Sequence, residues 1–278
     1  MKKRTYSKGF TLIELLVVVA IIALLLSILL PGLKMAKSYA KRVLCAARFR
    51  QVGVTLKVYS DANDDMLPDD HNIDGDRERH AYAVYRSEAD KGFILPNGKP
   101  KPLRYAYLYE QDYIQDPEIF YCPGNNPLYA EAYVYKNYIK PAPWGMLPQD
   151  FNTETSRNQW VRIGYLYYPI AKDTQLDPVY QAPKELATKY IQINTNLPIA
   201  SDIIHSHESI AHQYGGKYAL EFLYPDGHVV TCVNQDLFNN LLDPFGNNLW
   251  RTLDSGNLPN DTDYYDTAYY TVFRSLNY

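Results

Sequence analysis

Apolar residues fill the chain almost without interruption from Phe10 to Leu30, and Pro31 closes the run. A helix of about twenty apolar residues spans the roughly 30 Å hydrocarbon core of a bilayer. We therefore predict a membrane-spanning helix over residues 10–31. One carboxylate, Glu14, lies inside it. Because an ionisable group in a membrane helix costs at least ~2.5 kcal/mol, we expect Glu14 to have a function and a charged partner.

The helical spacing of apolar residues continues beyond Pro31. They follow one another at steps of mostly three and four residues: Leu33, Ala36, Ala40, Val43, Ala47, Val54 and Val58. This pattern predicts an amphipathic continuation of the helix over residues 32–60, with that stripe packed on a sheet. Pro31 is expected to kink or locally melt the helix, since it lacks a backbone donor. The helix should end near Ser60, where Asp and Asn side chains compete for the backbone.

Residues 61–278 are expected to form one globular head with loop-rich insertions. The strand candidates lie late in the chain, at residues 119–124, 161–168, 197–204, 218–224 and 228–233. The last two flank Pro225-Asp226-Gly227, which has the composition of a hairpin turn. The tail from Asn234 onward reads mostly as loop, with a short helix over 236–242. A long helix followed by strands, without strand–helix alternation, predicts an α+β fold with an antiparallel sheet and long irregular loops.

The first residues carry a recognisable pattern. Four cations precede Gly9, Phe10 follows it, and Glu14 is the fifth residue counted from Phe10. This segment resembles the leader and N-terminal helix of type IV prepilins and type II secretion pseudopilins. An ordinary signal peptide ends with a small-residue cleavage site, which Pro31-Gly32 does not provide. The resemblance implies a leader over residues 1–9, cleavage after Gly9, methylation of the new amine of Phe10, and a role for Glu14 in assembly.

The resemblance extends to short islands farther along the chain. Residues 42–45, 50–53, 59–68, Cys122-Pro123 and 222–229 are similar to a pseudopilin-like family found in planctomycetes and lentisphaerae. Within the last island Pro225 replaces the usual Ala. Together with the leader and the helix, these islands cover about half of the chain.

The resemblance also implies location and partners. We expect a single-pass protein of the inner membrane with a cytoplasmic N-terminus and a periplasmic or surface-exposed head. Its partners would be a prepilin peptidase, other pilin or pseudopilin subunits and the inner-membrane assembly platform. The sequence does not distinguish a subunit of a type II secretion pseudopilus from a subunit of a type IV-like filament. The alternative is a membrane-tethered module that binds polysaccharide and does not polymerise.

Charge and motifs narrow the function further. The net charge is −3, and it falls to −7 once the four leader cations are removed. An acidic exterior argues against a nucleic-acid partner held by bulk electrostatics. No Gly-rich phosphate loop, serine nucleophile elbow or HExxH motif is present in the sequence, so we do not expect an enzyme.

The three cysteines are too few for a disulfide scaffold. One bridge and one spare thiol is the simplest arrangement outside the cytoplasm. Both Cys45 and Cys122 match cysteine positions of the resembling family, which implies that they pair. The alternative is two buried free thiols. Cys232 is expected to be a small buried apolar residue.

One acidic segment has the first half of a calcium-loop pattern. Oxygen-bearing residues recur at the required spacing: Asp70, Asn72, Asp74, Asp76 and Glu78. However, Ala81 stands at the twelfth position, where a bidentate Glu belongs. A weak structural calcium site and a solvated acidic loop are both open. We expect no other cofactor, although His205, His207 and His212 could equally hold zinc or form a polar loop.

Tyrosine is the compositional outlier, with 27 residues against 9 Phe and 3 Trp. The tyrosines cluster within residues 105–113, 129–138 and 264–270. Such clusters suit a subunit contact or a sugar-stacking surface. They equally suit a loop-rich domain that uses tyrosine to fill its core.

Overall fold

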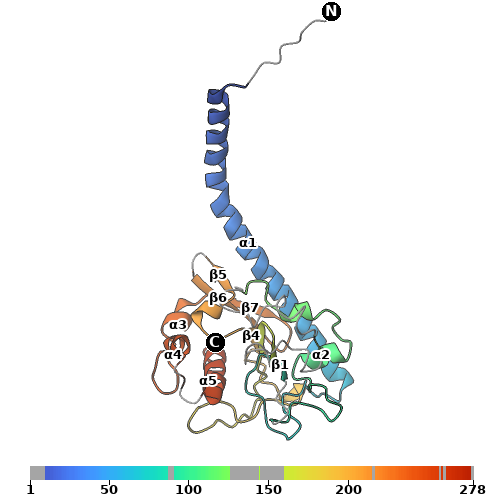
Figure 1. Ribbon diagram of the computed structural model, residues 1–278. Helices are drawn as coiled ribbons and strands as arrows, with labels where there is room; N and C mark the ends of the chain where they lie inside the picture. The colour runs from blue at the N-terminus through green and yellow to red at the C-terminus, as the bar shows by residue number, and fades with distance from the viewer. Residues whose placement is uncertain are drawn as a thin grey trace, which may run out of the picture.

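A long helix and a small head make up the protein (Figure 1). The computed structural model describes residues 10–86, 91–125, 144, 160–214, 217–256, 258 and 261–276. The first half of helix α1 (Leu12–Ala62) stands clear of the head, and its second half lies along it. The predicted α+β class is confirmed, because this helix precedes antiparallel sheets.

Helix α1 begins and ends through local hydrogen bonds. Thr11 is the N-cap, and its hydroxyl and the Glu14 carboxylate form a capping box. At the other end the Asn63 N–H bonds to the Ser60 carbonyl, so the helix stops two residues beyond the predicted end. Pro31 lies inside the unbroken helix, and the predicted local melting does not occur. Helix α1 bends along its length in Figure 1, and a proline within a helix is a common cause of such a bend.

The predicted orientation of the second half of α1 is wrong. The side that packs on the head carries residues at a helical spacing: Cys45, Phe49, Val52, Gly53, Leu56, Tyr59 and Ser60. The predicted stripe lies on the opposite side, where Val43, Val54 and Val58 are 50%, 62% and 50% exposed. Both sides of the helix are apolar, so periodicity predicted the helix without identifying the side that the head covers.

The main sheet is antiparallel and has five strands. Its path is β3 (Tyr165–Tyr167), β4 (Ala200–Asp202), β6 (Lys217–Leu223) and β5 (His212–Tyr214). Strand β7 (Val229–Cys232) also pairs with β6, along the part that β5 leaves free. Strand β6 is therefore the centre of the head, and α1 packs against this part of the sheet.

The predicted hairpin is confirmed between β6 and β7. The Tyr224 N–H bonds to the His228 carbonyl at 3.0 Å, and the Gly227 N–H bonds to the Tyr224 carbonyl at 2.9 Å. Gly227 has φ of 86°, a conformation that glycine adopts at little cost.

A second, two-stranded sheet joins β1 (Ala83–Arg86) to β2 (Trp160–Arg162). The strand predicted over residues 119–124 is wrong. Residues Pro117–Phe120 form the 3-10 helix η2 instead. Asp116 caps it and Pro117 occupies its first turn, both of which favour a helical start.

The tail is more helical than predicted. It contains α3 (Gln235–Asn239), α4 (Leu249–Ser255) and α5 (Asp261–Arg274), in addition to the earlier α2 (Ala106–Glu110). Helix α5 buries a stripe of residues at steps of three and four: Tyr264, Tyr265, Ala268, Tyr269, Val272 and Phe273. Packing of this stripe outweighs the modest helix propensity of tyrosine and aspartate.

Many tyrosines of the described residues lie in the core. Seven are at most 2% exposed: Tyr85, Tyr105, Tyr165, Tyr167, Tyr168, Tyr264 and Tyr269. The clusters at 105–113 and 264–270 therefore support the core interpretation. The cluster at 129–138 lies outside the described residues. Two further 3-10 helices, η7 (Tyr190–Gln192) and η8 (His207–Ser209), connect the strands.

Candidate functional site

The predicted assembly residues lie at the tip of α1. The leader, including Gly9, is outside the described residues, while Phe10 is 72% exposed. The Glu14 carboxylate oxygen Oε2 accepts hydrogen bonds from the Thr11 N–H at 2.9 Å and from the Thr11 hydroxyl at 2.8 Å. The carboxylate is thus held one turn from Phe10, the residue whose nitrogen would become the mature amine.

The apolar half of α1 has the length and composition of a membrane span. Among the described residues, it is the single helix that passes this test, and none of its most apolar window is buried in the protein. Its side chains point into the surroundings on every side: for example, Leu16 is 67% exposed and Ile28 is 71% exposed. Lipid or other apolar helices are therefore needed to shield the apolar surface of this half from water.

An apolar surface continues from the span down the second half of α1. We call it the outer stripe, and it consists of the exposed residues Leu33, Ala36, Ala40, Val43, Ala47, Val54 and Val58. By the 3.6-residue period, it runs along the side of α1 opposite the head. The outer stripe extends the exposed apolar surface of the span along the length of the subunit.

Polar and close contacts hold the other side of α1 on the head. Arg48 donates to the carbonyl oxygens of Glu118 and Tyr121 at 3.0 and 2.7 Å. Arg42 forms an ion pair of 3.9 Å with Glu221 of β6. A Cβ added to Gly53 would lie 3.0 Å from Leu223 Cδ1, so helix and sheet approach closely there. The head therefore holds α1 at several separate points.

The predicted disulfide is not present. Cys45 and Cys122 are both buried, free thiols, and their side chains interact with each other and with Asp202. The Cys45 thiol donates to Asp202 Oδ1 at 3.4 Å and lies 3.5 Å from the Tyr165 hydroxyl. Cys122 Sγ lies 3.2 Å from His212 Nε2. The two cysteines are brought together as predicted, within a larger polar cluster.

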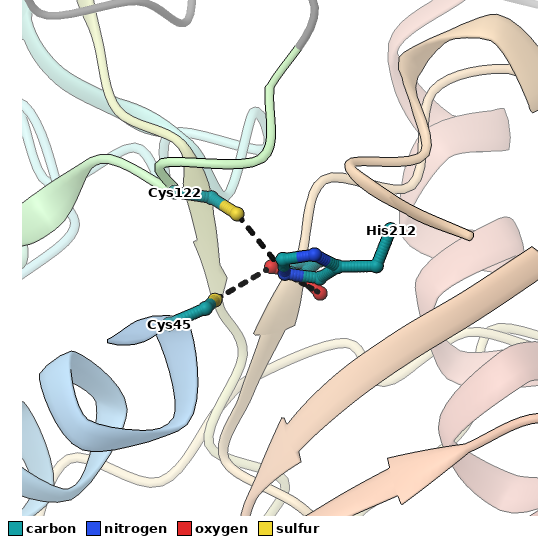
Figure 2. Close-up of side chains that lie close together, drawn as sticks. Cys45, Cys122 and His212 are labelled. Carbon is teal, nitrogen blue, oxygen red and sulfur yellow. Dashed lines mark hydrogen bonds and ion pairs between the residues drawn. The ribbon is translucent and has the colours of Figure 1, made fainter. Parts of the chain in front are cut away.

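Four elements contribute to this cluster, which we call the Cys–His–Asp cluster. Cys45 comes from α1, Cys122 from the turn after η2, Asp202 from the end of β4 and His212 from the start of β5. Figure 2 shows Cys45, Cys122 and His212 pointing toward one another. The four ligand atoms lie within 4.8 Å of one another, which makes these residues candidate metal ligands.

Burial controls the charges in the Cys–His–Asp cluster. It raises the pKa of both thiols, and it raises the pKa of Asp202 to about 8, with the nearby Glu221 acting in the same direction. Burial also lowers the pKa of His212 to about 4, and the positive charges of Arg42 and Lys41 contribute. In the protein alone, the neutral form of every member is favoured.

The residues of the predicted calcium loop do not converge. Asp70 faces Arg104, with 3.5 Å between Oδ2 and Nη2. The Glu78 carboxylate is buried, pairs with Arg86, and accepts hydrogen bonds from His80. Arginine side chains of the protein therefore pair with the carboxylates at the first and ninth positions of the loop pattern.

The middle of the same loop uses its oxygens internally. Asn72 Oδ1 accepts the N–H groups of Asp74 and Asp76 at 3.0 and 2.8 Å, and the Asn72 amide donates to the Lys91 carbonyl at 2.8 Å. The side chains of Asp74 and Asp76 are exposed. This geometry corresponds to the acidic-loop interpretation.

The three histidines considered for zinc are separated. His207 Nδ1 lies 2.7 Å from Asp254, and His205 Nε2 lies 2.9 Å from the Tyr265 hydroxyl. His212 alone joins the cysteines. Asp202 was not predicted as a site residue, although it stands as a lone carboxylate within the mostly apolar segment 197–204. A charged residue inside a buried strand is a signal that could have identified it.

The fold and the exposed helix define the class: a membrane-associated protein with one N-terminal apolar helix and an α+β head. Residues 4–30 match the family model described as the prokaryotic N-terminal methylation motif. The chain therefore has an N-terminus of the prepilin type, which implies processing by a peptidase and assembly with other pilin subunits. The matched segment includes Gly9, Phe10 and Glu14 and does not extend into the head. Neither the comparison with curated proteins nor that with solved structures found a match.

Proposed function

We propose that this protein is a pilin-like subunit that assembles through α1 into a type II secretion pseudopilus or a type IV-like filament. The observation that supports this best is the exposed apolar surface of α1. It covers the whole circumference of the membrane half and continues as the outer stripe opposite the head. Such a surface suits burial against neighbouring α1 helices, with the heads arranged outside them.

Glu14 gives the assembly its polar contact. After cleavage behind Gly9, the methylated amine of Phe10 keeps its positive charge. In the isolated chain the Glu14 carboxylate is held by Thr11. In a filament we expect it to pair with the Phe10 amine of a neighbouring subunit, which offsets the buried charge and sets the register between helices.

We place the protein in the inner membrane, with the leader in the cytoplasm and the head on the other side. Its partners are the prepilin peptidase, related subunits and the assembly platform, and its work is assembly rather than catalysis. The alternative, a tethered polysaccharide-binding module, relied on an exposed tyrosine surface. The described tyrosine clusters at 105–113 and 264–270 lie in or against the core, which favours the filament subunit.

Processing is tested by producing the full chain together with a prepilin peptidase and measuring the mass of the mature N-terminus. We expect cleavage between Gly9 and Phe10 and the added mass of a methyl group. An N-terminus that begins at Met1, or a cut beyond Pro31, would contradict the proposal.

Assembly is tested with Glu14→Leu. This variant should insert in the membrane at least as well as the parent, since a costly charge has been removed. Its co-purification with wild-type subunits should fall strongly, whereas Glu185→Gln, an exposed carboxylate on the head, should co-purify normally. Unchanged co-purification of Glu14→Leu would contradict the role of Glu14 in assembly, whereas a parent chain that does not co-purify with itself would favour the tethered module.

A further inference from the structure

We propose that Cys45, Cys122, Asp202 and His212 form a structural zinc site that fastens α1 to the head. The inference depends on the Cys–His–Asp cluster alone and is independent of filament assembly. No disulfide is needed for it, since the site uses both cysteines as thiolates.

The spacing of the four ligand atoms fits a tetrahedral ion. Zinc bond lengths of about 2.3 Å to sulfur and 2.0–2.2 Å to nitrogen or oxygen place neighbouring ligand atoms of a tetrahedron roughly 3.3–3.8 Å apart. Cys122 Sγ to His212 Nε2 is 3.2 Å and Cys45 Sγ to Asp202 Oδ1 is 3.4 Å, while His212 Nε2 lies 3.8 Å from the other carboxylate oxygen of Asp202, Oδ2. With one oxygen taken from Asp202, all four ligand atoms lie within 4.8 Å of one another, so rotations of the side chains would bring them around one ion.

The chemistry of the four donors selects the metal. Two sulfurs and an imidazole suit zinc, whereas magnesium and calcium prefer oxygen ligands. All four ligands come from the protein and are between 0% and 5% exposed. A closed set of four protein ligands is typical of a structural zinc site rather than a catalytic one, which keeps a position open for water.

Neighbouring groups orient three of the four ligands. The Gly124 N–H donates to Cys122 Sγ at 3.3 Å, and the Tyr165 hydroxyl lies 3.5 Å from Cys45 Sγ. The Glu221 N–H donates to Asp202 Oδ2 at 2.9 Å. Such contacts fix ligand geometry and stabilise negative charge on thiolates and carboxylates.

The position of the His212 ring depends on the absence of a side chain at Gly124. A Cβ on residue 124 would lie 2.7 Å from His212 Cε1 and 2.8 Å from Nδ1, so only glycine leaves room for the imidazole beside the Cys122 turn. The imidazole is thereby held with Nε2 next to Cys122 Sγ, and Figure 2 marks this contact.

A divalent cation also explains the burial of the cluster. Two thiols, a carboxylate and an imidazole are expensive to enclose, and burial holds the thiols protonated in the protein alone. When zinc binds, both thiols and the Asp202 carboxyl release their protons to solvent and become anionic ligands, and the ion offsets two of the three negative charges. The desolvated groups thus become a favourable binding site.

The test uses the full chain, purified in detergent under reducing conditions with a tag that does not bind metal. After incubation with zinc and removal of the excess, elemental analysis should find about one zinc per chain. Cobalt(II) in place of zinc should give the intense visible absorption of a tetrahedral thiolate complex.

Variants identify the ligands. Cys45→Ser and His212→Gln should each reduce bound zinc to near zero and remove the cobalt spectrum. The matched control is Cys232→Ser, which removes a buried thiol outside the cluster and should retain one zinc. Zinc retained at parental levels by Cys45→Ser or His212→Gln, or lost by Cys232→Ser, would overturn the assignment.

A more conservative variant distinguishes a loss of zinc binding from a loss of the fold. Tyr165→Phe keeps the ring and removes the hydroxyl beside Cys45 Sγ, so it should weaken zinc binding by about 10–100-fold in competition with a chromophoric chelator, with the fold retained. Unchanged affinity would overturn the proposed role of this cluster. The zinc site would also be excluded if protein isolated from the membrane without reductant contained no metal and had an intact mass two hydrogens below the expected mass. If reduction restored the expected mass, Cys45 and Cys122 would be joined by a disulfide.

Discussion

Arg48 of α1 donates a hydrogen bond of 2.7 Å to the carbonyl oxygen of Tyr121, the residue immediately before Cys122. Cys45 lies three residues earlier on the same helix, so both side chains face the same short segment of the head. The guanidinium also reaches the Glu118 carbonyl, and it therefore spans the two ends of the turn that leads to Cys122. The helix and this turn are positioned as one unit.

Arg48→Met should lower the free energy of unfolding of the head by about 2 kcal/mol. The change removes charge-assisted hydrogen bonds to two carbonyls, each typically worth about 1.5–3 kcal/mol, partly offset by retained apolar contacts. The additional pair with the half-exposed Glu118 carboxylate contributes little. Urea unfolding of the full chain in detergent, followed by tryptophan fluorescence, provides the measurement. Arg50→Met, at an exposed position on the same helix, should change stability little, and equal losses in both variants would contradict the assignment.

Glu78 should make the head sensitive to acid. Burial alone would raise the pKa of this carboxyl, but hydrogen bonds from His80 and the charges of Arg86 and Arg104 outweigh burial and lower it to about 2. Since the carboxyl has a pKa near 4.5 when unfolded, its contribution is fully present above pH 4.5 and is lost as the pH falls toward 2. The shift corresponds to about 3 kcal/mol.

The measurement compares the unfolding free energy of the parent with that of Glu78→Gln across this pH range. The difference between the two proteins should be large at pH 6 and should shrink below pH 4.5. A difference that stays constant down to pH 2 would show that the charge of Glu78 is not the cause.

Charges on the outer stripe should block assembly without unfolding the head. Val43 and Val54 are 50% and 62% exposed, so the double variant Val43→Lys, Val54→Lys should retain its melting temperature within a few degrees. It should fail to co-purify with wild-type subunits, because two charges would be buried between helices. Val179→Lys is the matched control, since this valine is 59% exposed on the head. Normal assembly of the double variant would exclude the outer stripe as a contact.

Calcium at millimolar concentration should leave the melting temperature of the head unchanged. The carboxylates of Asp70 and Glu78 face Arg104 and Arg86, and the Asn72 oxygen accepts backbone N–H groups, so the loop offers no converging ligands. Any ion that binds only the folded state would raise the melting temperature. A rise with calcium and not with magnesium, absent in Asp70→Ala, would restore the loop as a calcium site.

The helix and the hairpin were predictable because their signals are local. An apolar run of membrane length and a Pro-Asp-Gly turn are each contained in one short stretch of the chain. The face of α1 that packs on the head was not predictable in this way. Two opposite apolar stripes satisfy the same period, and only the distant strand β6 determines which of them is buried.

In the Cys–His–Asp cluster, too, one part was predictable from the sequence and another depended on long-range packing. Cys45 and Cys122 were brought into one neighbourhood by resemblance, as their positions in the structure bear out. Asp202 and His212 were not connected to them, because the four residues come from four elements whose meeting depends on the antiparallel order of β4, β6 and β5. His212 was grouped instead with its neighbours in sequence, His205 and His207, which have other partners.

The way α1 lies along the head has a mechanical consequence. The helix contacts the head over several turns, from Arg42 to Tyr59, while its other half extends away. A pull on the extended half, directed along the helix axis, is therefore a shearing load that Arg42, Arg48 and the packed side chains bear at the same time. Contacts loaded together resist force better than contacts opened one after another, so we expect the contact between α1 and the head to resist tension directed along the helix.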